Sequence, residues 1–457
     1  MERAPVIASA ALGWASPALG GRTLAALVLV YLLPVLLAIA IVTPPWQNPD
    51  EPLHMARAVQ VAHGGLLGYR AWTTAGGLSD PAIYEAYEPV RHAAMHPAER
   101  LSRADLAASR AVRFSATISY VSFPNTAQYP PVFYAGAAAA YWLGRAGDLS
   151  IDQTLLVARA ANAILFSLGA AAALAWARRT RLLLACVLLL PTTLSLACSA
   201  SQDGPMLAAT ALAVALLDRI VTEQRAATRA EAGCVAILLA AVAMARPPYA
   251  GFLLLLLLLY PRPSGASLRL AGAAGCAVLA WCLLVALHIS VRLSQADPHA
   301  QLAFLAASPG RIPDIIAATE RAYLPDYWQQ LIGVLGWTDA PLPRAYEWFA
   351  TLVLILAAGA SAAGPSRLVW APLTGIVFAA IAIFVLQYLT WTWPGQLVIT
   401  GVLGRYFTPL AMVFPLALPA WPWATRLRGP ATLGALALAA VTPAVMVHAV
   451  LVRYYMK

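Results

Sequence analysis

The stretch TPPWQNPDEPLHMARAVQVAHGG, residues 43–65, follows directly on an uncharged apolar run, residues 24–42. At about 1.5 Å per residue, a helix of that length crosses the hydrocarbon core of a bilayer. Asp50 and Glu51 then lie just outside the membrane. Prolines bracket them at the start of a helix, where the helix dipole favours ionised carboxylates. Two interpretations are open: a functional site at the membrane face, or Asp50 as a helix cap beside a solvated Glu51.

Composition places the chain among the membrane proteins. Of its 457 residues, 61% are hydrophobic and only 11% are charged, which is typical of a polytopic helical membrane protein. The basic residues before the first apolar run precede no cleavage site, so we expect the first span to remain and the chain to start in the cytoplasm. The net charge of +10 is scattered without a nucleic-acid-binding motif, so we expect no nucleic-acid partner.

The apolar runs predict an all-α fold with about eleven membrane helices. Two shorter helices, 232–245 and 247–260, are divided by Arg246-Pro247-Pro248 and are expected to form a hairpin that turns at the outer face. The nine longer runs are 24–42, 154–176, 181–199, 204–222, 268–293, 346–363, 367–391, 404–423 and 431–451.

The run YPPVFYAGAAAAYWLG, residues 129–144, decides the topology. If it crosses the membrane, Arg178, Arg179 and Arg181 fall outside. If it lies in or on the outer leaflet, they fall inside, as the positive-inside rule favours. At about 16 residues the run is also short for a span, so we predict an interfacial helix.

This topology predicts one integral-membrane domain, residues 1–457, with two long external loops. Loops of this length in a compact helical protein are usually functional. The first loop, 43–153, contains two juxtamembrane helices at 52–63 and 130–144; the second covers 294–345; and 346–457 supplies the C-terminal membrane helices.

Several polar residues converge on the external face. The segment SASQDG, residues 199–204, places Asp203 at the outer end of a hairpin between two spans. Asp203 is there either as a helix N-cap or as part of a site. Arg405, in GRYF, either binds an anion, for which its planar fork suits phosphate, or snorkels to lipid headgroups. His54 and Arg57 follow Asp50 at helical spacings, so they either orient that acid or form a solvated helix face.

Six motifs, taken in order, resemble those of a bacterial family of multi-spanning membrane proteins of unknown function. That family looks like a branch of the GT-C superfamily of glycosyltransferases, and the resemblance runs from about residue 24 to residue 425. The PDEP-x-H element carries most of its specificity. The motifs are NPDEPLHMARAVQVAHGG, YPPVFY, CSASQDG, ARPPY, LGWTDAPLP and GRYF.

The resemblance implies a GT-C-like catalytic module at residues 24–293, which includes the first external loop. It implies that Asp50 is the catalytic base, with Glu51 beside it, and that Asp203 is the acid of the next external loop. These three acids are the candidate ligands if Mg²⁺ or Mn²⁺ takes part, although SASQDG offers one acid only. The candidate substrate-binding residues are Arg405, Tyr406, His54, Arg57, Asp203 and Tyr129.

The expected function is that of an inverting glycosyltransferase in the bacterial inner membrane. It would move a sugar from a polyprenyl-phosphate donor to an envelope glycan or lipid at the periplasmic or outer face. Membrane lipids would surround the protein. A nucleotide sugar is not expected, because no nucleotide-binding fold is present. The alternative is a transporter or flippase for a lipid-linked saccharide. Against it, no carboxylate lies near the middle of an apolar run and no inverted repeat is apparent.

Overall fold

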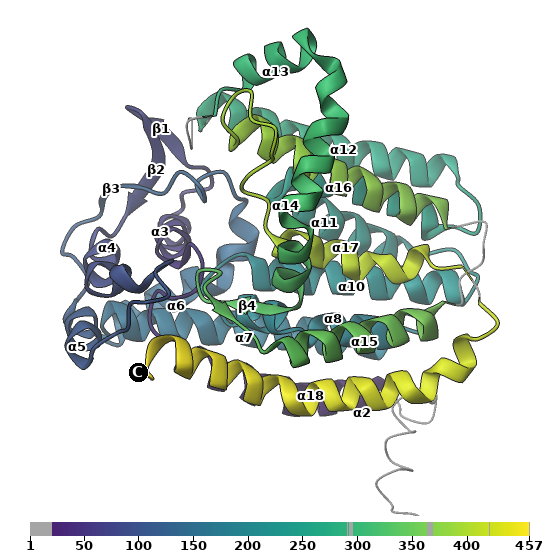
Figure 1. Ribbon diagram of the computed structural model, residues 1–457, viewed down its shortest axis with the longest axis horizontal. Helices are drawn as coiled ribbons and strands as arrows, with labels where there is room; N and C mark the ends of the chain where they lie inside the picture. The colour runs from purple at the N-terminus through teal and green to yellow at the C-terminus, as the bar shows by residue number, and fades with distance from the viewer. Residues whose placement is uncertain (1–20, 290, 292–295, 363–368, 420, 457) are drawn as a thin grey trace, which may run out of the picture.

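The computed structural model describes residues 21–289, 291, 296–362, 369–419 and 421–456. The expectation about how the chain starts concerns residues outside this part. The fold is mostly helical, and Figure 1 shows the long helices lying roughly along one direction, with the elements of the first loop gathered at one end of the bundle.

Six helices in the described part of the chain are long and apolar enough to cross a membrane. All six coincide with predicted runs, which confirms a helical membrane protein; the total of eleven spans stays a prediction. They are α2 (Gly21–Val42), α7 (Ile151–Trp176), α10 (Asp203–Thr222), α12 (Gly265–His288), α16 (Trp370–Thr390) and α18 (Ala424–Tyr454).

Two of the predicted runs are not continuous helices, because proline interrupts them. Run 181–199 divides into α8 (Arg181–Leu188) and α9 (Pro191–Ala197). Run 404–423 is a series of short pieces that ends well before residue 423. These pieces are η6 (Gly404–Phe407), α17 (Thr408–Val413) and η7 (Phe414–Ala417).

The predicted hairpin at Arg246 is present. It consists of α11 (Arg229–Ala245) and the 3₁₀ helix η3 (Pro247–Leu259). The N–H of Ala227 donates to the carbonyl of Leu259 at 2.8 Å, so the start of α11 and the end of η3 lie side by side, far from the turn. Arg246 therefore stands at the turn.

The loop at residues 43–153, which the sequence predicts to be external, contains a small sheet that the all-α prediction missed. Its strands are β1 (Tyr69–Ala71), β2 (Thr74–Ser79) and β3 (Ser119–Ser122), antiparallel in that order. Short strands without apolar alternation give little sequence signal. The loop helices are α3 (Glu51–Ala62), α4 (Ala82–Tyr87), η1 (Glu88–Ala93), α5 (Arg103–Ala111), η2 (Pro131–Tyr134) and α6 (Ala135–Ala146).

Helix α10 separates the acidic motifs from the arginines that set the predicted topology. Asp203 begins α10, and Asp218 lies in its last turns. The backbone N–H groups of Arg178, Arg179 and Thr180 all donate to Asp218, at 2.6, 2.9 and 3.1 Å. These arginines therefore lie at the opposite end of α10 from Asp203, as the predicted topology requires.

The predicted second loop is largely helical and holds the GRYF motif in place. Within it, α14 (Ile312–Gly333) runs across the direction of the bundle helices in Figure 1. Gln330 of α14 accepts the N–H of Gly404 at 2.8 Å. A Cβ at Gly404 would lie 2.2 Å from the carbonyl oxygen of Tyr327, so only glycine fits there. The elements are α13 (Pro298–Ala307), η4 (Pro309–Arg311), α14 (Ile312–Gly333), β4 (Val334–Leu335) and β5 (Ala340–Pro341), followed by α15 (Arg344–Ser361).

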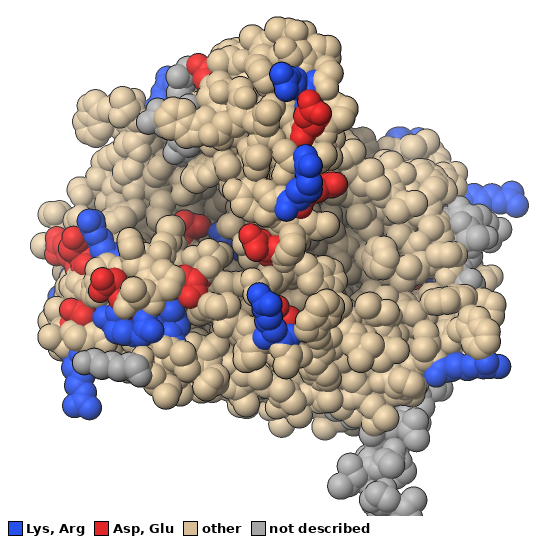
Figure 2. Space-filling model, in the orientation of Figure 1, with Lys and Arg blue, Asp and Glu red and all other residues tan. Residues whose placement is uncertain are grey.

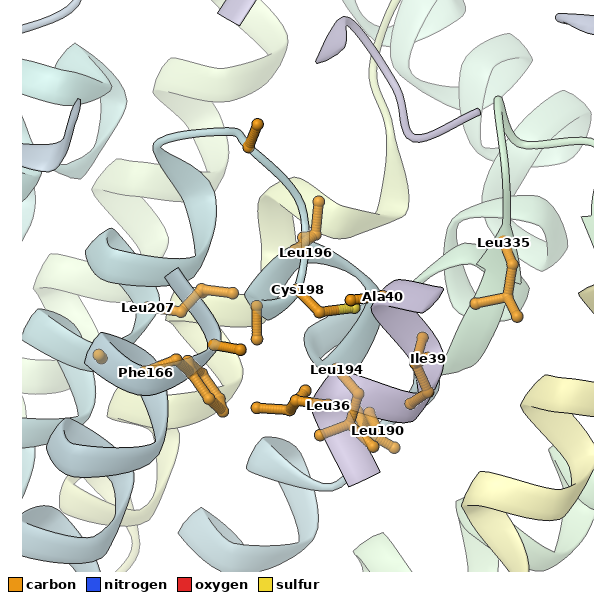
Figure 3. Close-up of a cluster of buried hydrophobic side chains, with 14 of the residues drawn as sticks. Leu36, Ile39, Ala40, Phe166, Leu190, Leu194, Leu196, Cys198, Leu207 and Leu335 are labelled. Carbon is orange, nitrogen blue, oxygen red and sulfur yellow. The ribbon is translucent and has the colours of Figure 1, made fainter. Parts of the chain in front are cut away.

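The hydrophobic core beneath the first loop joins helices that are far apart in sequence. Figure 3 shows Leu36 and Ile39 of α2 beside Leu194 of α9, with Phe166 of α7 and Leu207 of α10 in the same cluster. All five side chains are buried. Close packing of this kind fixes the positions of the helix ends that carry the polar residues described next.

Candidate functional site

Three acids and three arginines from distant segments form ion pairs at the end of the bundle that carries the first loop. Each acid has a different arginine as its partner, and two of these arginines, Arg159 and Arg246, were not among the sequence candidates. The pairs are Glu51 with Arg159 at 2.6 Å, Asp203 with Arg246 at 2.9 Å, and Asp50 with Arg405 at 3.3 Å.

Asp50 lies in a tight, strained turn. Its φ is +59° and that of Trp46 is +65°; this left-handed conformation costs roughly 1–2 kcal/mol for most residues and is best tolerated by Gly, Asn and Asp. The buried indole of Trp46 anchors the turn by donating to Asp152 at 2.9 Å. Asp50 precedes α3 but makes no side-chain cap hydrogen bond. The capping interpretation is therefore wrong, and its carboxylate faces Arg405.

Glu51 is fully buried, so the interpretation as a solvated residue is also wrong. Its Oε1 accepts from Arg159 Nε at 2.8 Å, from Asn48 at 3.1 Å and from the N–H of Ala200 at 3.1 Å. Its Oε2 accepts from Arg159 Nη2 at 2.6 Å. These contacts leave the carboxylate no open side for a substrate and tie the PDEP turn to α7 and to the loop after α9.

Arg159 extends the same network to the end of α2. It donates to the carbonyls of Ala40, Thr43 and Pro44 at 2.7–2.9 Å. The sequence did carry a signal for this residue, because an arginine within the apolar run 154–176 requires a buried partner. Its partner, Glu51, could be identified only in the folded chain.

Asp203 and Arg246 form the second pair. The helix begins at Asp203 itself, with Gln202 in the cap position, so the N-cap interpretation is wrong. The Arg246 guanidinium lies 4.8 Å from the ring centroid of Tyr406 and 5.8 Å from that of Tyr129. The Tyr249 hydroxyl donates to the Tyr406 carbonyl at 2.9 Å and fixes this arrangement. The ARPPY motif was the signal that could have marked Arg246 as a site residue.

Arg405 points into the protein and pairs with Asp50, so the snorkelling interpretation is wrong. Its guanidinium also lies 5.8 Å from the ring centroid of Tyr406. Tyr406 is thus adjacent to both Arg246 and Arg405. The Nε of Arg405 is buried and has no hydrogen-bond partner within the described residues. This cation therefore retains hydrogen-bonding capacity that the protein does not use.

His54 is buried near Asp50 and Asp203. Its Nδ1 lies 2.7 Å from the Tyr134 hydroxyl, and its ring stacks on Tyr129 with 6.0 Å between centroids. Burial lowers the pKa of His54 to about 4, although the nearby charges of Asp203 and Asp50 act in the opposite direction. His54 is therefore a neutral imidazole at pH 7. Tyr134, in YPPVFY, is a further residue that the site candidates did not include.

Arg57 does not join the acids and does not form a solvated face. It donates to the carbonyls of Gly65 at 3.0 Å and of Leu66 and Tyr129 at 2.8 Å, and also to Gln60. Burial lowers its pKa to about 10, so it stays charged at pH 7. Arg57 thus holds the chain reversal after α3 against the segment that carries Tyr129.

The metal candidates are not gathered around one open position. Glu51 is enclosed by Arg159 and its neighbours, whereas Asp50 and Asp203 bind separate arginines. In the described part of the chain, no group of three His, Cys, Asp or Glu side chains could hold a metal ion.

The surface is hollowed at the end of the bundle that carries the first loop. Figure 2 shows this face of the molecule hollowed between the first-loop elements and α14, with both acidic and basic side chains within the hollow. The arrangement combines a partly exposed carboxylate, buried guanidinium groups and aromatic faces at the end of an apolar helix bundle. It can bind an anion and accept a proton.

Residues 33–414 match the family of predicted membrane proteins designated DUF2142, and the chain therefore belongs to that family. No curated protein matches the chain. No solved structure matches it either.

Proposed function

We propose that this DUF2142 protein is a glycosyltransferase of the bacterial inner membrane that uses a polyprenyl-phosphate sugar as donor. The main support is the contact between Asp50 and Arg405 at 3.3 Å. It combines a proton acceptor and a phosphate-binding group at the end of an apolar bundle that can hold an isoprenoid chain. The acceptor is an envelope glycan or lipid, and the hollow faces the periplasm or exterior.

The chemistry needs one base and one cation. Asp50 accepts the proton of the acceptor hydroxyl as the hydroxyl oxygen forms a bond to the anomeric carbon. The bond from that carbon to the phosphate oxygen breaks, and the phosphate leaves with the bonding electron pair. Attack opposite the leaving group inverts the anomeric centre. A positioned base contributes about 10²–10⁴-fold to such a rate, and Arg405 stabilises the charge that develops on the departing phosphate.

The other residues position these two groups. Glu51 and Arg159 fix the strained turn that presents Asp50. Arg246, paired with Asp203, lies against the ring of Tyr406. The rings of Tyr129 and Tyr406 are partly exposed and can contact a sugar, whereas the buried, neutral His54 supports Tyr129 without adding charge.

The test uses purified full-length protein with a panel of polyprenyl-phosphate sugars and native membranes as the source of acceptor. We expect one donor to release free polyprenyl phosphate while its sugar appears in a glycan or lipid, and we expect the Asp50→Asn variant to abolish this release. Turnover of no donor, or equal turnover by Asp50→Asn, would overturn the proposal. Movement of an intact lipid-linked sugar from one leaflet of a vesicle membrane to the other would instead identify a flippase.

A further inference from the structure

We infer that Arg405 is an exchangeable partner of Asp50: it masks the carboxylate in the resting protein, and the phosphate of a lipid ligand takes over the guanidinium and frees the carboxylate. The use of the freed carboxylate as a base rests on the proposed function. The exchange itself is a property of binding and can be measured without any sugar transfer.

The first support is the difference between the three ion pairs. Glu51 makes two contacts with its arginine, at 2.6 and 2.8 Å, and both side chains are buried. Asp203 pairs at 2.9 Å and its side chain is 4% exposed. Asp50 makes one contact with Arg405, at 3.3 Å, and its side chain is 29% exposed. The pair between Asp50 and Arg405 is therefore the longest and the most open to a competing anion.

The second support is the unused hydrogen-bonding capacity of Arg405. Its Nη2 donates to Asp50, but its Nε is buried without a partner among the residues that the structure describes. A buried donor without a partner is unfavourable. Two oxygens of one phosphate group can accept from a guanidinium in parallel, so a phosphate satisfies this cation more completely than Asp50 does.

The third support is the charge balance. The two aspartates of the site offset Arg246 and Arg405, and His54 is neutral because its pKa is about 4. A bound phosphate therefore makes one carboxylate surplus. The exchange thus frees this carboxylate from its cation at the moment when the donor is in place, and it sets an order in which the donor binds before the acceptor is activated.

The test measures the affinity of the purified full-length protein in detergent for undecaprenyl phosphate. Asp50→Asn removes the competing charge and keeps a residue type that tolerates the positive φ of this position. We expect Asn at this position to tighten binding about tenfold, as the loss of a charged competitor predicts. Asp314→Asn is the matched control, because it removes one charge from an exposed pair with Arg311 outside the site. We expect it to leave the affinity unchanged.

A second variant removes the cation instead of the carboxylate. Arg405→Gln should weaken binding at least tenfold, and adding Asp50→Asn to it should give a much smaller gain, because only the repulsion between Asp50 and the phosphate is then relieved and there is no longer a cation to compete for. An unchanged or weaker affinity in folded Asp50→Asn would overturn the inference, as would an undiminished gain in the double variant. Parallel titrations with inorganic phosphate and phosphatidylglycerol separate the ligand sources. If Asp50→Asn tightens the binding of inorganic phosphate equally, the exchange is supported and its ligand is any free phosphate. If it tightens the binding of phosphatidylglycerol equally, the exchange is supported and its ligand is a general lipid headgroup.

The outcomes for the exchange and for the proposed function are distinct. Tighter binding by Asp50→Asn without sugar transfer by any form of the protein would support the exchange and remove the glycosyltransferase. Sugar transfer by the wild type with no gain in affinity would retain the glycosyltransferase and remove the exchange.

Discussion

Asp50 and Arg405 lie 355 positions apart in the chain, and their side chains meet at 3.3 Å. The contact joins the first motif of the family resemblance to the last. It depends on α14, because Gln330 and the backbone of Tyr327 hold Gly404 immediately before the arginine. This contact is therefore assembled from the first loop, the predicted second loop and the segment after α16.

Substitution of Arg405 by lysine tests whether its planar fork matters. A point charge cannot reproduce paired hydrogen bonds to a phosphate, so we expect Arg405→Lys to lose about tenfold or more in donor affinity and Arg405→Ala to lose more. The defect should appear with every acceptor, because the contact is to the shared donor. Donor titrations and turnover of both variants provide the measurement. A fully active Arg405→Lys protein with unchanged donor affinity would contradict the assignment.

Arg246 should be more than a partner for Asp203. Arg246→Lys keeps the charge but loses the planar guanidinium that lies against the rings of Tyr406 and Tyr129, where cation–π contacts contribute about 0.5–2 kcal/mol. We expect turnover to fall about tenfold while the protein stays folded. Tyr406→Phe is the matched control, since it keeps the ring, and it should retain most activity, whereas Tyr406→Ala should not. Equal activity of Arg246→Lys and wild type would show that only the charge matters.

Glu51 should be a stability residue. Glu51→Gln leaves the buried Arg159 without its charged partner, and breaking a buried ion pair typically costs about 3–5 kcal/mol. We expect a large fall in the thermal unfolding temperature in detergent. Glu88→Gln removes the same charge from an exposed pair with Arg91 and should leave that temperature nearly unchanged. A stable Glu51→Gln protein that lacks only turnover would favour a direct catalytic role instead.

His54 predicts how stability depends on pH. Its pKa is lowered from 6.5 to about 4 in the folded protein, so the unfolded chain binds the proton more readily between these values. The free energy of unfolding therefore falls as the pH drops from about 6.5 to about 4, by up to about 3 kcal/mol from this group. Unfolding of wild type and His54→Gln across this range is the measurement. The His54→Gln curve should be shallower, and parallel curves would contradict the prediction.

The two ends of α10 should lie on opposite sides of the membrane. In a cysteine-free background, Arg91→Cys in the first loop should react with an impermeant external reagent in intact cells. Arg178→Cys, beyond the far end of α10, should react only after permeabilisation, because the positive-inside rule places it in the cytoplasm. Both side chains are accessible enough for labelling. External labelling at Arg178→Cys would reverse the sidedness proposed for the site.

The sequence by itself determined the class of the fold and several of its parts. Apolar runs too long and too poor in charge for a soluble core predicted the spanning helices, because a bilayer interior requires them. Prolines predicted the hairpin that turns at Arg246 and the start of α3 beside Asp50. Motif order along the chain was sufficient to indicate the family to which the chain belongs.

Only the tertiary structure decided which acid pairs with which arginine. Two adjacent carboxylates look equivalent in the sequence, yet Glu51 is buried against Arg159 and Asp50 faces Arg405. The reason is physical: a buried charge needs a partner brought by a neighbouring helix, and local spacing carries no information about which distant segment supplies it. The short sheet depended in the same way on packing between segments that are remote in the chain, because β3 joins β2 from about forty residues further on.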